Sequence, residues 1–313
     1  MSHFAFLFPG QGSQYSGMGR ELAHAFPESQ EVFDVADRAL ARPLSRLCFE
    51  GSDEELALTE NTQPAILTVS VAALRALEAA GLRPAAAAGH SLGEYSALVA
   101  AGTMDFTDAV RSVHLRGRFM QEAVAVGEGA MAAIIGLSHE QVEAICRESA
   151  GDQVVSAANL NGPGQTAIAG HTAAVERTMA AAERAGAKRA LRLPVSAPFH
   201  CELMQPAAER LRPVLGDLEL RDPGYPVYTN VDAAPVERGD DARDALLRQV
   251  ASPVRWQELI ESMISSGIGT FIEVGPGKVL AGLVRRIQKG ARVLSVGDPA
   301  GVARAREAVG APA

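Results

Sequence analysis

A Gly-x-Ser-x-Gly motif at residues 89–93 is the clearest sign of chemistry in this sequence. A short apolar run precedes it, and a stretch with helical character follows it. A strand, this motif and a helix together form a nucleophile elbow, a sharp turn that exposes a serine hydroxyl. Gly89 and Gly93 leave room where side chains would collide in so tight a turn. Ser91 is therefore the candidate nucleophile.

A serine nucleophile needs a base, and the chain offers seven histidines. His200 lies in a proline-bracketed loop and is either that base or a surface or capping histidine. His90 is expected to support the elbow structurally, because adjacent residues on the turn point apart. No carboxylate is marked as the third member of a triad. Glu273 and Asp298 are possible, and a backbone or amide oxygen would instead give a Ser-His dyad.

Arg116 lies on the apolar stripe of a helix predicted at about 105–123, whereas Arg118 points to the opposite side. The stripe is formed by the apolar residues at positions 106, 109, 113, 120 and 124. An inward-facing guanidinium costs free energy unless its hydrogen bonds are accepted. Either a protein carboxylate such as Glu122 or Glu94 accepts them, or Arg116 forms a fork for a substrate carboxylate.

The segment 8–14, Phe-Pro-Gly-Gln-Gly-Ser-Gln, follows an apolar strand predicted at 4–8. Its spacing is not that of a phosphate-binding P-loop or a dinucleotide fingerprint. One interpretation is an ordinary Pro-Gly turn. The other is an oxyanion hole made by the N–H of Gln11 and the N–H of Leu92, the residue after the nucleophile.

The elements that must position these residues alternate between strands and helices, which predicts a parallel α/β sheet. Helices are expected from about 18, 28 and 64, and further strands at 227–230, 270–274 and 292–296. Between 127 and 196 the pattern changes to β-α-β-β-α-β, the ferredoxin-like arrangement. We therefore predict a catalytic domain at 1–126 and 197–300, a ferredoxin-like subdomain at 127–196, and a loosely ordered tail at 301–313. A cleft between the two units is the natural binding site.

Composition narrows the class of protein. The 313 residues are 47% hydrophobic and 21% charged, as in an ordinary globular protein, and no apolar run is long enough to cross a bilayer. A formal net charge of −8 argues against nucleic acid as a partner. The three cysteines have no paired spacing, which argues against a disulfide framework or a metal site and for a cytoplasmic location.

Eight segments in chain order resemble malonyl-CoA:acyl carrier protein transacylases, bacterial fatty-acid-synthesis enzymes related to polyketide synthase acyltransferase domains. The resemblance runs from about residue 4 to about residue 288. The matching segments are 8–14, 62–65, 89–95, 116–121, 159–165, 198–200, 248–254 and 273–277. It implies an α/β-hydrolase-like domain with a parallel sheet and an inserted ferredoxin-like subdomain.

The resemblance also implies a role for each site residue. Ser91 would attack the thioester of malonyl-CoA, with His200 as base and the main-chain carbonyl of Gln249 orienting that histidine. The oxyanion would rest on the N–H groups of Gln11 and Leu92, and Arg116 would pair with the malonyl carboxylate. Other substrate-site residues implied are Gln63, His90, Asn159, Asn161 and Phe199. Phe199 would also crowd a branched methylmalonyl group.

The implied reaction is ping-pong transfer of the malonyl group to the phosphopantetheine thiol of acyl carrier protein. No bound cofactor and a cytoplasmic monomer are expected, and the carrier could serve fatty acid, polyketide or malonate-decarboxylase metabolism. Two basic groups are either docking sites for an acidic carrier or solvated faces. They are Lys188, Arg189 and Arg192, and Lys278, Arg285, Arg286 and Lys289.

Two other functions use the same features. A serine esterase or thioesterase shares the elbow, but such enzymes usually carry their histidine near the C-terminus, and here over a hundred residues follow His200. A non-catalytic subunit that only binds a carrier is disfavoured by the intact set of Ser91, His200 and Arg116.

Overall fold

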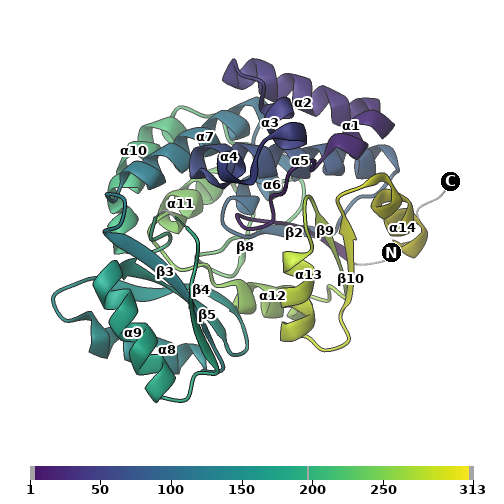
Figure 1. Ribbon diagram of the computed structural model, residues 1–313. Helices are drawn as coiled ribbons and strands as arrows, with labels where there is room; N and C mark the ends of the chain where they lie inside the picture. Colours follow the sequence, from purple (N-terminus) through teal and green to yellow (C-terminus); the bar gives the residue numbers. More distant parts are fainter. Residues whose placement is uncertain (1–3, 196, 310–313) are drawn as a thin grey trace.

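The larger of two β-sheets contains the elbow (Figure 1). The computed structural model describes residues 4–195 and 197–309. This sheet has the order β10-β9-β1-β2-β7-β8, and its neighbouring strands run parallel except β7 and β8. The strands are β1 Phe4–Phe8, β2 Ala86–Gly89, β7 Val227–Tyr228, β8 Pro235–Val236, β9 Thr270–Val274 and β10 Arg292–Val296.

Helices cover both faces of this sheet, and the alternation of side chains along β1 explains why that strand is apolar throughout. Phe6 belongs to the core beneath α5 and α7, whereas Leu7 belongs to the core beneath α12 and α13. No helix in the described part of the chain is long and apolar enough to cross a membrane. The helices around the sheet are α1 Arg20–Ala25, α2 Pro27–Leu40, α3 Leu44–Glu50, α4 Asp53–Ala57, α5 Thr59–Ala79, α6 Gly93–Ala100, α7 Phe106–Glu122, α10 Gln205–Gly216, α11 Gly239–Gln249, α12 Trp256–Ser265, α13 Val279–Ile287 and α14 Pro299–Val309, with a short 3-10 turn η1 at Glu202–Met204.

The second sheet is antiparallel, with the order β4-β5-β3-β6, and it stands to one side with α8 and α9 (Figure 1). Its elements follow the chain as β3 Gly129–Ile135, α8 His139–Ala150, β4 Val155–Gly162, β5 Gln165–His171, α9 Thr172–Arg184 and β6 Arg189–Arg192. This is the predicted ferredoxin-like arrangement beside a larger parallel sheet, so the predicted fold class is confirmed.

Strand β4 of the small sheet is also hydrogen-bonded to a segment of the larger domain. The N–H of Val254 donates to the carbonyl of Ala158 at 2.9 Å, and the N–H of Leu160 donates to the carbonyl of Val254 at 2.9 Å. The segment that precedes α12 is therefore bonded to the edge of the small sheet.

Helix α5 begins five residues before the predicted start at Pro64. A proline inside a helix leaves the carbonyl four residues earlier without its usual donor. Here that carbonyl, of Glu60, accepts hydrogen bonds from His114 Nδ1–H at 3.0 Å and from Arg42 at 3.4 Å. These side chains satisfy the carbonyl, so the helix continues through Pro64 and carries Gln63 within it.

The prediction of a loose tail is wrong for the residues up to Val309, because Pro299–Val309 forms α14. Val302 and Ala305 are buried on this helix, which packs against β10. Asp298 accepts the N–H of Gly301 at 2.5 Å and so caps the helix. Four of the eleven residues of α14 are alanines, and alanine is a strong helix former, so this segment favours a helix. The rest of the predicted tail, residues 310–313, lies outside the described residues.

Candidate active site

Ser91 occupies the turn between β2 and α6 with a left-handed backbone, φ 53°. The turn is tight because β1 passes close behind it. A Cβ atom on Gly93 would lie 2.1 Å from the carbonyl oxygen of Phe8, and one on Gly89 would lie 1.9 Å from the backbone of Gly93. The N–H of Ser91 donates to Asn230 Oδ1 at 2.7 Å. The two glycines thus permit the strained turn that holds the serine hydroxyl above the sheet.

His200 lies against the candidate nucleophile, with its Nε2 2.8 Å from Ser91 Oγ. Its Nδ1 is 2.9 Å from the main-chain oxygen of Gln249. A carbonyl only accepts, so Nδ1 carries the proton and Nε2 is left to accept from the serine. Burial, together with the positive charge of Arg116, lowers the pKa of His200 to about 3. The imidazole is therefore neutral near neutral pH, as a general base must be.

The two acids considered from the sequence lie elsewhere. Glu273 accepts the N–H groups of Leu280 and Ala281 at 2.9 and 3.0 Å and caps α13. Asp298 caps α14, as described above. Neither carboxylate bonds His200. The main-chain carbonyl of Gln249 occupies the place where such an acid would bond the imidazole.

Arg116 projects from α7 into the same site and is 1% exposed. Its Nη1 donates to Gln63 Oε1 at 2.8 Å, and its Nη2 donates to Gln249 Oε1 at 2.8 Å and to Ser91 Oγ at 3.1 Å. The acceptors of these bonds are neutral oxygens. No carboxylate among the described residues accepts a hydrogen bond from Arg116. A buried guanidinium beside a nucleophile and without a touching counter-ion is suited to an anionic ligand.

The two carboxylates considered as partners of Arg116 lie in different places. Glu122 forms surface ion pairs, with Arg118 at 3.6 Å and Arg210 at 2.7 Å. Glu94 is buried and, among the residues that the structure describes, its hydrogen bonds reach Arg116 only through the side chain of Gln249. The interpretation of Arg116 as half of an internal salt bridge is therefore not supported by a direct contact.

Gln11 and Leu92 follow β1 and β2, which are parallel neighbours, so both residues reach the same edge of the sheet. Within the described part of the chain, the N–H groups of these two residues donate no hydrogen bond. Both residues line the cavity that contains Ser91 Oγ. The geometry suits two backbone donors aimed at a developing negative charge.

A cavity of about 270 Å³ opens over Ser91, between the large sheet's edge and the small sheet. It is lined by Gln11, Gly12, Gln14, Ala57, Gln63, His90, Ser91, Leu92, Arg116, Met120, Met131, Asn159, Leu193, Pro194, Val195, Phe199 and His200. Nine of the residues predicted from the sequence are in this lining. The cavity thus combines a polar end at Ser91 and Arg116 with apolar walls.

Asn161 and Gln249 do not line the cavity and act on residues that do. Asn161 Oδ1 is 2.9 Å from His90 Nε2, and the ring of Trp256 lies 5.3 Å from that of His90. Burial lowers the pKa of His90. His90 is therefore held by its neighbours beside the elbow, as expected of a structural partner.

Asn230 is a site residue that the sequence analysis missed. Its side-chain amide donates to Gly89 O at 2.7 Å, while its Oδ1 accepts from Ser91 N–H. Its own N–H donates to Glu94 Oε2 at 2.8 Å. The available signal was a polar residue just beyond β7, at the carboxyl end of the parallel strand beside β2.

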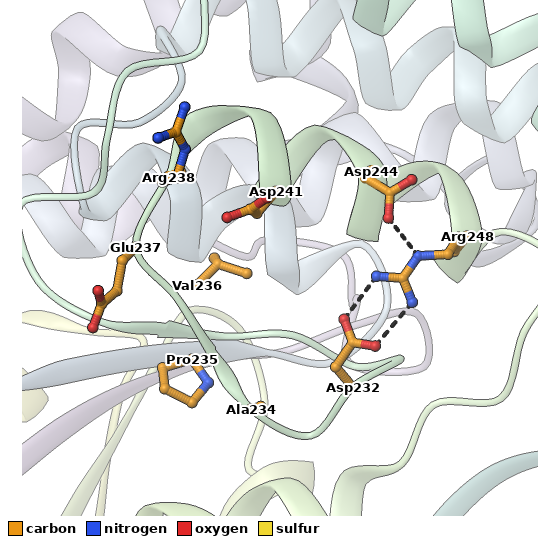
Figure 2. A pocket seen from close by; sticks show the side chains of 9 residues that line it. All are labelled: Asp232, Ala234, Pro235, Val236, Glu237, Arg238, Asp241, Asp244 and Arg248. Atoms are coloured by element: carbon orange, nitrogen blue, oxygen red, sulfur yellow. Dashed lines mark hydrogen bonds and ion pairs between the residues drawn. The ribbon is translucent and has the colours of Figure 1, made fainter.

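A second hollow, of about 490 Å³, lies beside α11 and is shown in Figure 2. Three of its charged groups pair with one another: Arg248 donates to both oxygens of Asp232 at 2.9 and 2.8 Å, and to Asp244 at 2.6 Å. The residues that line it include no serine, cysteine or histidine. We assign no reaction to it.

Comparison with known proteins agrees with this arrangement. Residues 5–304 match the acyl transferase domain family. The malonyl CoA-acyl carrier protein transacylase of Escherichia coli (strain K12) is 51% identical over 308 residues, which is 98% of this chain and 100% of the relative. The structure of the malonyl CoA-acyl carrier protein transacylase from Coxiella burnetii matches with a TM-score of 0.97 and 47% identity over 98% of each chain. A chain in the structure of a type II PKS acyl-carrier protein in complex with its malonyl-transacylase matches with a TM-score of 0.96 and 48% identity, over 98% of this chain and 100% of that chain.

Proposed function

Because the chain belongs to the malonyl-CoA:acyl carrier protein transacylase family, we propose that it moves a malonyl group from malonyl-CoA to the phosphopantetheine thiol of an acyl carrier protein. The observation that carries the proposal is the buried Arg116 guanidinium, whose Nη2 lies 3.1 Å from Ser91 Oγ. A cation so placed recognises an acyl group that bears its own carboxylate.

In the first half-reaction, Ser91 Oγ attacks the thioester carbonyl carbon of malonyl-CoA while His200 Nε2 takes the hydroxyl proton. The carbonyl of Gln249 accepts from Nδ1–H and stabilises the imidazolium that forms. The C–S bond then breaks, and the CoA sulfur leaves with the proton from His200. Malonyl-Ser91 ester and free CoA remain.

The oxyanion of each tetrahedral intermediate is proposed to rest on the N–H groups of Gln11 and Leu92. Both donors are fixed by backbone rather than by side-chain rotamers, so little reorganisation is needed when charge develops. Removing one such donor from an enzyme typically costs about 10²–10³-fold in kcat.

In the second half-reaction, the carrier's phosphopantetheine thiol attacks the ester carbonyl and His200 accepts its proton. The C–O bond breaks, and Ser91 Oγ recovers the proton as malonyl carrier protein leaves. Arg116 holds the same carboxylate through both halves, which keeps the acyl carbonyl near the two proposed oxyanion donors.

Malonyl is proposed in preference to methylmalonyl because Phe199 and Met120 both line the cavity. Gln63 and Asn159 are proposed as further substrate contacts, the first because it also bonds Arg116 Nη1. Equal rates of Ser91 labelling by the two thioesters would remove this part of the proposal.

The carrier is proposed to dock beside the cavity at one of the two basic groups. The first, on and near β6, leads directly into the cavity wall at Leu193 and surrounds the exposed Leu191 in the sequence. The second follows Gly277, which packs against Ser13, and includes Arg286, close to Gly162 at the end of β4. Arg192 pairs with Glu176 at 3.1 Å, and Arg285 bonds the carbonyl of Val293 at 2.9 Å, so the other basic side chains of each group are the stronger candidates.

We further propose that the protein works in the cytoplasm as a monomer without a bound cofactor. Cys48, Cys146 and Cys201 are buried free thiols, as expected in a reducing compartment.

Intact mass after brief mixing with malonyl-CoA tests the proposal. Wild type should gain one malonyl group that holo acyl carrier protein removes, and Ser91→Ala should gain none. Free malonate released without a carrier-dependent chase would point to a hydrolase instead. No adduct on wild type would refute malonyl transfer.

A further inference from the structure

Glu94 is a fully buried carboxylate that the mechanism above does not use. It follows Ser91 by three residues, in the first turn of α6. Its Oε2 accepts the backbone N–H of Asn230 at 2.8 Å and the side-chain amide of Gln249 at 2.9 Å. Its Oε1 has no partner among the described residues. Glu94 thus lies directly behind the nucleophile and touches both residues that support it.

The contact with Gln249 fixes which way that amide points. Glu94 Oε2 accepts from the Gln249 amide and a guanidinium only donates, so the Gln249 NH₂ faces Glu94 and its Oε1 faces Arg116. Gln249 NH₂ also bonds the carbonyl of Ser91 at 3.0 Å. The result is a chain of hydrogen bonds from Glu94 through Gln249 to Arg116 Nη2.

Charged groups around Glu94 affect the free energy of its ionised form. Arg116, from α7, is the cation that favours its ionised form, while Asp232, beyond β7, opposes ionisation. Tyr95, next on α6, is also buried and lies under the guanidinium, with Arg116 Cζ 5.8 Å from its ring centroid. Burial outweighs these effects and raises the pKa of Glu94 to about 7. A carboxylate kept at such a cost, with one oxygen unpartnered, is not needed for packing.

We propose that Glu94 is a positioning residue that confers acyl specificity: it orients Gln249, and Gln249 holds the Arg116 fork in line with a malonyl carboxylate. The inference rests on the proposed function, because it assigns Arg116 to that carboxylate. Its consequence is specific. Loss of the Glu94 acceptor should impair malonyl transfer to Ser91 and leave transfer of an acetyl group, which has no carboxylate, nearly unchanged.

The test is the ratio of Ser91 labelling rates with malonyl-CoA and acetyl-CoA, measured on folded protein by rapid-quench intact mass. Glu94→Ala removes the acceptor and is expected to lower the ratio about tenfold, the factor for one charge-assisted hydrogen bond. Glu94→Gln places an amide oxygen where Oε2 lies and should keep the ratio within about threefold of wild type. Glu94→Asp withdraws the acceptor by one methylene without emptying the site, so it should behave like Glu94→Ala and replaces that variant if it does not fold.

Glu273→Ala is the matched control, because Glu273 is equally buried and also accepts two backbone N–H groups, but at α13. It should lower stability and leave the labelling ratio unchanged. Parallel loss of both labelling reactions in Glu94→Asp or Glu94→Ala would overturn the inference, as would a ratio in Glu94→Gln as low as in Glu94→Asp. A wild type with no malonyl labelling would instead refute the proposed function.

Discussion

Replacing Arg116 by alanine is the most direct test of how this site selects its acyl group. Arg116 makes three hydrogen bonds within the site and lies 3.1 Å from the oxygen that would carry the acyl group. A bidentate pair with a carboxylate supplies two charge-assisted hydrogen bonds of roughly 1.5 kcal/mol or more each. Their loss should slow malonyl labelling of Ser91 by at least about 100-fold, since each 1.4 kcal/mol is about a factor of ten.

Acetyl labelling should respond differently to Arg116→Ala, because the acetyl group has no charge that pairs with the guanidinium. The substitution also makes the cavity less polar, which suits an uncharged acyl group. We expect its rate to stay within about threefold of wild type or to rise. Arg118→Ala is the control, since Arg118 lies on the same helix but pairs with Glu122 at the surface. Rapid-quench intact mass with each thioester measures both rates. Equal loss of both reactions in Arg116→Ala would show that Arg116 supports the fold of the site rather than the malonyl carboxylate.

Three further predictions concern the base, the carrier and the elbow. Because the neutral imidazole is the active form and the pKa of His200 is lowered to about 3, Ser91 labelling should persist well below the ordinary histidine pKa of 6.5; a stopped-flow profile with its acid limb near 6.5 would contradict this. Charge reversal at the true docking group, Lys188→Glu with Arg189→Glu or Lys278→Glu with Arg286→Glu, should raise KM for carrier protein and leave malonyl-CoA labelling intact; a joint loss would mark that group as structural. Gly93→Ala should prevent stable folding, as measured by a thermal melt, because its Cβ would lie 2.1 Å from Phe8 O. The control Gly282→Ala, in α13 with open space around it, should fold as wild type does or be slightly more stable. Equal melting temperatures of the two variants would refute the packing argument.

Local sequence patterns predict the parts of this site that are contiguous in the chain. They do not predict the contacts between residues that are far apart in the sequence. The elbow at Ser91 follows from a strand, two glycines and a helix that are contiguous in the chain. The inward position of Arg116 follows from helical periodicity alone. The partner of His200, by contrast, is a backbone carbonyl 49 residues away, which leaves no trace in residue type, and only family resemblance suggested Gln249.

Asn230 and the start of α5 were missed for a related reason. Asn230 bonds Ser91 across 139 residues of sequence, so its role depends on β7 pairing with β2. The turn of α5 before Pro64 exists because His114 and Arg42 satisfy the carbonyl that the proline leaves open. In both cases the decisive hydrogen bonds are tertiary, and local propensity does not encode them.

The proximity of Arg116 and His200 links substrate recognition to catalysis in the proposed reaction. Arg116 is one of the causes that lower the pKa of His200, after burial itself. A malonyl carboxylate bound to Arg116 would offset that positive charge and raise the basicity of Nε2 just as Ser91 must lose its proton. An acetyl group brings no such charge, so His200 would face it as a weaker base. In the proposed reaction the cavity would thus favour malonyl twice, once by binding its carboxylate and once by activating the base.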